Sequence, residues 1–341
     1  MWNALLGRGF FAGSSLALSL ALCPGGLACS GNSAQIPAPT GGSANATDPG
    51  ASASGGAKED AGGSGGATTD AATSNDDAGA EGPWPGSQVF FFHFPPQKQA
   101  SHPSWGTALT DIVRHLHSTY GTQYDHPDDR VTWGTLVSHG ISSHLRFAYN
   151  VTGKPANGLY LMQDRATLVV EPKIHLADVA PRVPASLRGA RWQSAVVGPA
   201  KDWNDTPTFV LEQWIASTNG SEVGVDLVKQ GLWGTTVRDA VGGTFELSLY
   251  ALAFGLAVEE LDPTYFAENP LTRELLAWNI ERAMRLFAEG SQMPPFTNLA
   301  QEDHATKWKT AADAAPLRNF ARRLFGGTYC AKVLGISAHA E

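Results

Sequence analysis

Hydrophobic and polar positions along the chain follow two periods, which together predict a mostly helical α+β domain with a small antiparallel sheet. A run of large apolar residues over 88–94 has the composition of a buried strand and stops at Pro95-Pro96. Two strand-like segments, 158–162 and 166–170, lie three residues apart, which is the gap of a β-hairpin. Apolar residues recur at helical spacing elsewhere and predict helices over about 108–121, 131–145, 207–218, 241–260 and 270–289, with short helices over 174–188 and 299–334.

The first 82 residues have a different composition from the rest of the chain. Residues 1–29 have the pattern of an export signal, in which Arg8 and an apolar run precede small residues and Cys29. A cysteine at this place resembles the lipid-accepting residue of a bacterial lipoprotein. Residues 30–82 contain one large apolar residue, Ile36, among Gly, Ala, Ser, Thr and Asp, and such a segment cannot bury enough apolar surface to offset its ordering entropy.

The sequence therefore predicts a signal peptide over 1–29, a disordered linker over 30–82 and one globular domain over 83–341. It predicts an exported protein held at the outer membrane by a lipid anchor at Cys29; plain release into the periplasm or outside the cell is the alternative. Only Cys330 remains in the globular part, so an internal disulfide is excluded there and a buried apolar thiol is expected.

Charge excludes one class of partner. The net charge is −8, and seven of the 32 acidic residues but only two of the 24 basic residues precede residue 83. The globular part is thus close to neutral, its basic residues are scattered, and no nucleic-acid partner is expected.

The segment Trp133–Ile141, on the helix predicted over 131–145, has the spacing of a zinc-peptidase motif. In an H-E-x-x-H helix two histidines one turn apart bind zinc, and the glutamate beside the first is the general base. Here Thr135 and His139 hold the two histidine positions, separated by Leu136-Val137-Ser138. Threonine is not a usual zinc ligand, and Leu136 cannot take a proton from water. The motif predicts a retained scaffold with lost or impaired chemistry.

With this motif, the segment from about Phe90 to Leu334 resembles a group of uncharacterised exported bacterial proteins, chiefly myxobacterial, of the zincin metallopeptidase type. In that group a Trp-x-His-Glu-x-x-His-Gly-Ile run opens the site. Other segments that resemble the group are Val183–Gly189, Leu211–Ala216, Thr218–Gly220 and Ala277–Asn279. The resemblance implies a zincin-like fold. It also implies a third metal ligand on a later helix, as in zincins of the glutamate-ligand type, where this chain has Glu212-Gln213; a ligand at position 213 would be lost.

Counting ligands decides what the motif can bind. A catalytic zinc keeps three protein ligands and one open position, and His139 with Glu212 provides two. His144 cannot be the third, because five residues along a helix turn it about 140° away from His139. We therefore expect no zinc or weakly bound zinc, and a pseudo-peptidase that binds a peptide or a cell-envelope component.

Whether hydrolysis remains is open at this point. An active zinc-dependent hydrolase would need non-standard ligands, for example His93, His139 and His175 together. His115 and His117 flank Leu116 on opposite sides of a helix, which argues against a metal shared between them. A serine hydrolase would need Gly at position 136 and a strand before Ser138, and the sequence offers neither.

Two glutamates in apolar helices and the tryptophans near polar loops are further candidate functional residues. Glu246 and Glu281 lie in apolar helical stretches, where a carboxylate needs a partner such as Arg238 or Arg282. The chain has ten tryptophans, and a non-enzymatic alternative is a glycan-binding module built on those near polar loops, namely Trp105, Trp203 and Trp233.

Overall fold

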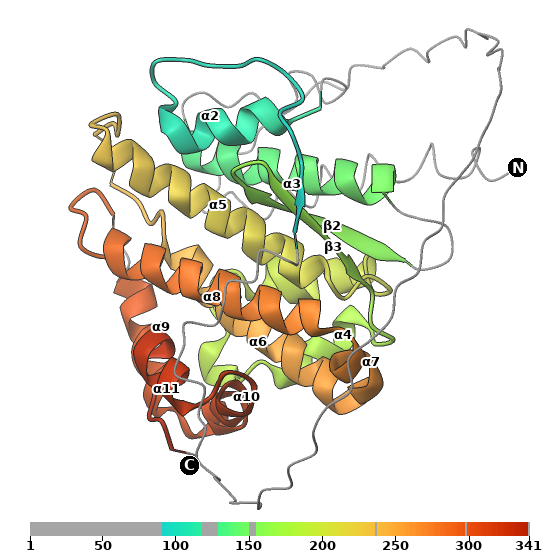
Figure 1. Ribbon diagram of the computed structural model, residues 1–341. Coiled ribbons are helices and arrows are strands. Elements are labelled where there is room, and N and C mark those ends of the chain that lie inside the picture. The colour runs from blue at the N-terminus through green and yellow to red at the C-terminus, as the bar shows by residue number, and fades with distance from the viewer. Residues whose placement is uncertain (1–90, 118–128, 150–154, 236, 297–298, 340–341) are drawn as a thin grey trace, which may run out of the picture. The chain divides into compact units, whose positions relative to one another are not determined.

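A computed structural model describes residues 91–117, 129–149, 155–235, 237–296 and 299–339 (Figure 1). The predicted signal peptide, the lipid-accepting Cys29 and the linker over 30–82 lie outside the described residues. Within them the chain is mostly helical with one small antiparallel sheet, so the predicted α+β class is confirmed.

The sheet has three antiparallel strands in the order β1-β3-β2: β1 (Phe92–His93), β2 (Ala156–Met162) and β3 (Arg165–Val170). The hairpin β2–β3 was predicted from its three-residue gap. Its turn is tight, because Met162, Gln163 and Asp164 all have φ between 54° and 65°, a left-handed conformation that residues other than glycine rarely adopt. Gly158 lets β2 approach α3 closely, since a Cβ there would lie 2.4 Å from the Cβ of Leu145.

The helices follow the predicted pattern with two differences at their ends. Their bounds are α2 (Gly106–His115), α3 (Arg130–Tyr149), α4 (Leu176–Val179), α5 (Phe209–Lys229), α6 (Gly242–Leu261), α7 (Pro263–Glu268), α8 (Pro270–Gly290), α9 (Leu299–Thr310), α10 (Ala315–Phe325) and α11 (Gly327–Tyr329). Asp129 caps α3, because its carboxylate accepts from the backbone N–H of Thr132 at 3.1 Å and from its hydroxyl at 2.6 Å. Helix α2 ends at His115, earlier than predicted, because Leu116 is extended.

Helix α5 continues eleven residues beyond the predicted end at 218, and that prediction was wrong. Asn219 and Gly220, two residue types that commonly end helices, are buried between helices here. Gly220 lies against α3, where a Cβ would be 2.0 Å from the hydroxyl oxygen of Thr135. The side chain of Asn219 donates to Ser138 at 3.2 Å and to the carbonyl of Tyr160 at 3.0 Å. Tertiary contacts therefore satisfy polar groups that would otherwise favour a turn.

The main core surrounds α6, whose residues Gly242–Val258 are all buried. Helices α5, α8 and α10 pack around it, which is why its sequence is apolar on every side. None of the helices within the described residues is both long enough and apolar enough to span a membrane.

Helices α2, α3, α5 and α8 lie one beside the next in Figure 1. A second, smaller core fills the space between α2, α3 and the sheet, with Leu109, Ile112, Val137, Ile141 and Leu145 fully buried. Helix α3 thus packs against both the sheet and α5, and this position places the motif residues against α5.

Candidate functional site

A pocket of about 80 Å³ lies beside the motif helix α3. Thr132, Thr135 and His139 of α3 form one wall, and Gln213, Ser217 and Ser221 of α5 form another. The spacings of three and four residues bring these side chains to one face of each helix. Thr135 and His139, the two positions of the zinc motif, therefore open into the same pocket, together with Gln213, the alternative position of the third ligand.

Two arginines reach the pocket from outside α3 and α5, and each is paired with carboxylates. Arg191 lies 3.5 Å from Glu246 and 3.9 Å from Asp239. Arg238 forms an ion pair with Asp129, the cap of α3. The lining thus carries charges of both signs among hydroxyl and amide groups. Such a lining matches polar groups of both kinds, donors and acceptors, on a ligand.

Behind the pocket, His139 and Glu212 are brought together by α3 and α5. Nδ1 of His139 lies 3.2 Å from Oε1 of Glu212, and both side chains are at most 5% exposed. The other oxygen, Oε2, accepts from the guanidinium of Arg146 and, at 3.2 Å, from the amide of Asn157. Arg146 also donates to Asn157 at 2.8 Å, which closes a four-residue network.

The network holds Glu212 as a carboxylate. Burial by itself would raise the pKa of Glu212, but the charge of Arg146 and the hydrogen bond with His139 hold the pKa below its ordinary value. A metal ion at Glu212 would face the guanidinium of Arg146 and compete with the bonds already made to both oxygens. Arg146 is itself held in place, because it lies over the ring of Trp203 at 4.7 Å. The arrangement is that of a buried ion-pair network.

Thr135 does not replace the missing histidine in this network. Its hydroxyl donates to the carbonyl of Val131 at 3.1 Å, within the helix, and packs against Gly220. Glu212 is bonded within the network and does not line the pocket, although its partner His139 does; Gln213 lines the pocket. The two candidate ligands predicted for the motif, His139 and Glu212, are thus neighbours, and the third ligand position remains a threonine.

The other histidine arrangement considered from the sequence does not form. His93 is exposed on β1, and His175 is exposed and paired with Asp205 at 3.1 Å. In the part of the chain that the structure describes, the one group of three metal-ligating side chains with donor atoms within 4.8 Å of one another is elsewhere. Ser138 lies buried in the middle of α3, so it cannot form a nucleophile elbow.

The partners predicted for two glutamates need correction. Glu246 is fully buried and accepts from the backbone N–H of Arg191 at 2.8 Å and from the hydroxyl of Tyr250 at 2.6 Å, so its partners are not Arg238 or Arg282. Glu281 is exposed on α8 and needs no buried partner. Helical periodicity places these residues on a helix but not against a particular neighbour.

The tryptophans named for glycan binding each pack against another aromatic ring of the protein. Trp105 contacts Trp133 edge-on at 5.0 Å, Trp203 stacks on Phe209 at 5.1 Å, and Trp233 contacts Phe296 at 4.9 Å. These contacts leave less ring surface for a sugar than an exposed aromatic platform would. Cys330 is a free, buried thiol, as predicted.

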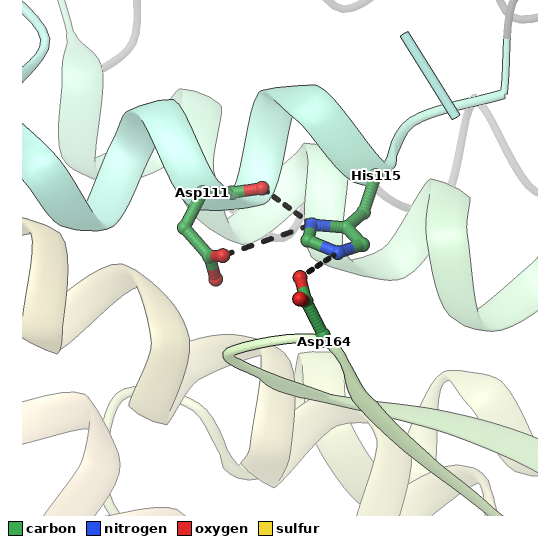
Figure 2. Close-up of side chains that lie close together, drawn as sticks. All are labelled: Asp111, His115 and Asp164. Carbon is green, nitrogen blue, oxygen red and sulfur yellow. Dashed lines mark hydrogen bonds and ion pairs between the residues drawn. The ribbon is translucent and has the colours of Figure 1, made fainter. Parts of the chain in front are cut away.

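The group of ligating side chains that sequence reasoning missed is Asp111, His115 and Asp164 (Figure 2). Asp111 and His115 are one turn apart on α2, and Asp164 comes from the hairpin turn, 49 residues away from His115. The i, i+4 spacing of Asp111 and His115 was visible in the sequence. The third member was not, because only the docking of the hairpin onto α2 brings Asp164 to the ring.

Comparison of the chain with known protein families, with curated proteins and with solved structures finds no match. The resemblance to zincins thus stays a prediction, and the geometry of the pocket and its surroundings carries the functional argument.

Proposed function

We propose that the domain binds a peptide of the cell envelope by inserting one polar side chain or chain end into the pocket between α3 and α5. The observation that carries this proposal is the lining, in which Thr135, His139 and Gln213 face one cavity with Ser217 and Ser221. A pocket of about 80 Å³ has room for several water molecules or one side chain, and is too small for a whole peptide. The rest of a peptide would lie along the surface outside it.

The domain acts as a pseudo-peptidase in this proposal, without zinc-dependent hydrolysis at α3. Leu136 provides no general base, and Thr135 uses its hydroxyl within the helix. The guanidinium of Arg146, bound to Glu212, opposes a cation next to His139. These three features leave the pocket polar and able to bind a ligand, while the groups that would activate water are missing from their motif positions.

The location proposed is the cell envelope, with a lipid on Cys29 and the linker over 30–82 holding the domain away from the membrane. Metabolic labelling with a fatty-acid probe tests this part. Label on the wild-type chain and none on Cys29→Ser is the expected result, and equal labelling of both chains would contradict it.

Binding is tested with the full chain and an array of short fluorescent peptides of defined sequence, by fluorescence polarisation. Ser217→Trp fills the pocket and should weaken binding of the selected peptides by about tenfold or more, which corresponds to about 1.4 kcal/mol. Ser101→Trp, at an exposed position outside the pocket, is the matched control and should bind like the wild type. Equal binding by both tryptophan variants would locate the peptide elsewhere.

A gain-of-function variant tests the register of the motif. Because positions 135 and 139 open into one pocket, Thr135→His with Leu136→Glu should add one zinc equivalent relative to the parent chain. A correctly folded double variant that binds no additional zinc would show that α3 does not present these positions as an H-E-x-x-H helix does.

A further inference from the structure

We propose that Asp111, His115 and Asp164 form a binding site for a divalent transition-metal ion, with zinc as the best match. The site joins α2 to the turn between β2 and β3 and shares no residue with the pocket between α3 and α5. It is therefore independent of the proposed peptide binding.

His115 presents one ring nitrogen to the site and anchors the other. Nδ1 lies 2.6 Å from the backbone carbonyl oxygen of Asp111, which can only accept, so Nδ1 carries a hydrogen. Nε2 points at Oδ1 of Asp164, 2.8 Å away (Figure 2). A histidine that binds a metal usually donates its second ring N–H to a carbonyl or carboxylate, which fixes the tautomer and the ring orientation. His115 has this arrangement at Nδ1. Its Nε2, which hydrogen-bonds to Asp164, is the atom that would bind the metal in place of that bond.

Asp111 is oriented by neighbours in the same way. Its Oδ2 accepts from the hydroxyl of Tyr160 at 2.9 Å and from the backbone N–H of Gln163 at 2.9 Å. Its Oδ1 lies 3.8 Å from the ring of His115. Tyr160 is fully buried, so its hydroxyl is held in place as a donor to the carboxylate. A ligating carboxylate supported by such hydrogen bonds is a feature of built metal sites.

Asp164 supplies the third ligand and the access from solvent. It lies in the hairpin turn with φ of 58°, and its side chain is 45% exposed. One donor atom from each of the three residues lies within 4.8 Å of the others. Ligand atoms around a tetrahedral zinc are about 3.4 Å apart, given zinc–ligand distances of about 2.0–2.2 Å. Reaching that spacing requires rotation of the exposed Asp164 side chain and a shift of the Asp111 carboxylate toward Nε2, because its Oδ1 faces Nδ1 at 3.8 Å.

The donor set selects the kind of ion. One imidazole nitrogen and two carboxylate oxygens suit zinc or another first-row divalent ion better than magnesium or calcium, which prefer oxygen ligands only. Two carboxylates offset the charge of a divalent cation. The nearby Arg282 is neutralised by Glu222, whose carboxylate it contacts at 2.5 and 2.8 Å. Three protein ligands leave one position for water.

Zinc binding by the full chain without a histidine tag tests the proposal, measured by isothermal titration calorimetry with zinc chloride and by metal analysis after dialysis. The wild type should bind one equivalent of zinc. Asp164→Asn should weaken binding by more than about 100-fold, the upper end of the loss seen when only a supporting residue is changed. Asparagine tolerates the left-handed conformation of the turn and keeps an oxygen facing His115, so this variant should fold.

His115→Gln is the second loss-of-binding variant, and circular dichroism establishes whether it is folded. His139→Gln is the control, because it removes the histidine of the motif helix and leaves the α2 site intact; it should bind zinc like the wild type. Three results would overturn the proposal: no zinc on the wild-type chain, unchanged affinity in Asp164→Asn, or binding lost in His139→Gln and retained in Asp164→Asn.

Discussion

Breaking the buried network behind the pocket should have a large and specific effect on stability. Arg146 and Glu212 are 10% and 3% exposed in their side chains, and their contact joins α3 to α5 across 66 residues of sequence. Arg146→Met keeps most of the apolar volume of the side chain and removes the charge. It leaves the carboxylate of Glu212 buried with only His139 and Asn157 as partners.

The expected cost follows from this geometry. Removing one partner of a buried ion pair destabilises a protein by about 3–5 kcal/mol, because the remaining charge is desolvated without compensation. That is a large part of the roughly 5–15 kcal/mol by which a domain is stable. Arg146→Met with Glu212→Gln removes both charges. The double variant should therefore lose less free energy of unfolding than the sum of the two single losses, by about 2 kcal/mol or more.

Acid should act in opposite directions on the wild type and on Arg146→Met. In the wild type the pKa of Glu212 is below its ordinary value of 4.5, so its contribution is complete above pH 4.5 and is lost as the pH falls through the lowered pKa. In Arg146→Met burial dominates and raises that pKa. The variant should therefore become relatively more stable as the pH falls, when Glu212 takes up a proton.

Urea denaturation of the wild type, both single variants and the double variant measures these quantities at neutral and acidic pH. Glu289→Gln, at a partly exposed salt bridge with Lys229, is a control that should cost about 1 kcal/mol or less. Additive single effects, or a cost below about 1 kcal/mol for Arg146→Met, would refute the view that the four-residue network is a buried, coupled ion pair.

Three further predictions concern packing, pH and thiol reactivity. Gly220→Ala should destabilise the chain by about 1–3 kcal/mol, because its Cβ would meet the Thr135 hydroxyl. Adding Thr135→Ala to the same chain should recover most of this loss in a thermal melting experiment, and no recovery would place the clash elsewhere. Burial raises the pKa of Glu171 from 4.5 to about 7, despite its bonds with Thr208. The stabilisation from its protonated form is complete below pH 4.5, so the free energy of unfolding should fall by about 3 kcal/mol as the pH rises through 7. Glu171→Gln should show no such fall in urea denaturation. Burial also raises the pKa of Cys330 to about 11, so a thiol reagent at pH 8 should label it only after denaturation, and rapid labelling of the native chain would contradict its burial.

The sequence by itself determined the helices, the hairpin and the class of the domain. Apolar residues at helical spacing predicted α6 and α8 to within one residue at each end, and α3 except for its last turn. The three-residue gap between two strand-like segments predicted β2 and β3. Asp129 stands immediately before α3, where aspartate commonly caps a helix, and it accepts from the backbone N–H of Thr132. These features depend on interactions between residues a few positions apart, so local pattern is enough to find them.

Only the tertiary structure decided which helices and strands contact one another. The length of α5 depends on Gly220 fitting against α3 and on Asn219 finding partners on α3 and β2, and neither contact has a local signal. The motif indicated His139 and, through a resemblance, Glu212. It did not indicate Arg146, whose charge changes what the pair can bind.

The cluster of Asp111, His115 and Asp164 also depends on tertiary packing. Asp111 and His115 are a turn apart in the sequence, and that spacing is common on helices without any metal. Asp164 makes the difference, and it reaches His115 only because the β2–β3 turn docks on α2. Contacts between elements distant in sequence depend on how the helices and the sheet pack, and the pattern of a single sequence does not contain that information.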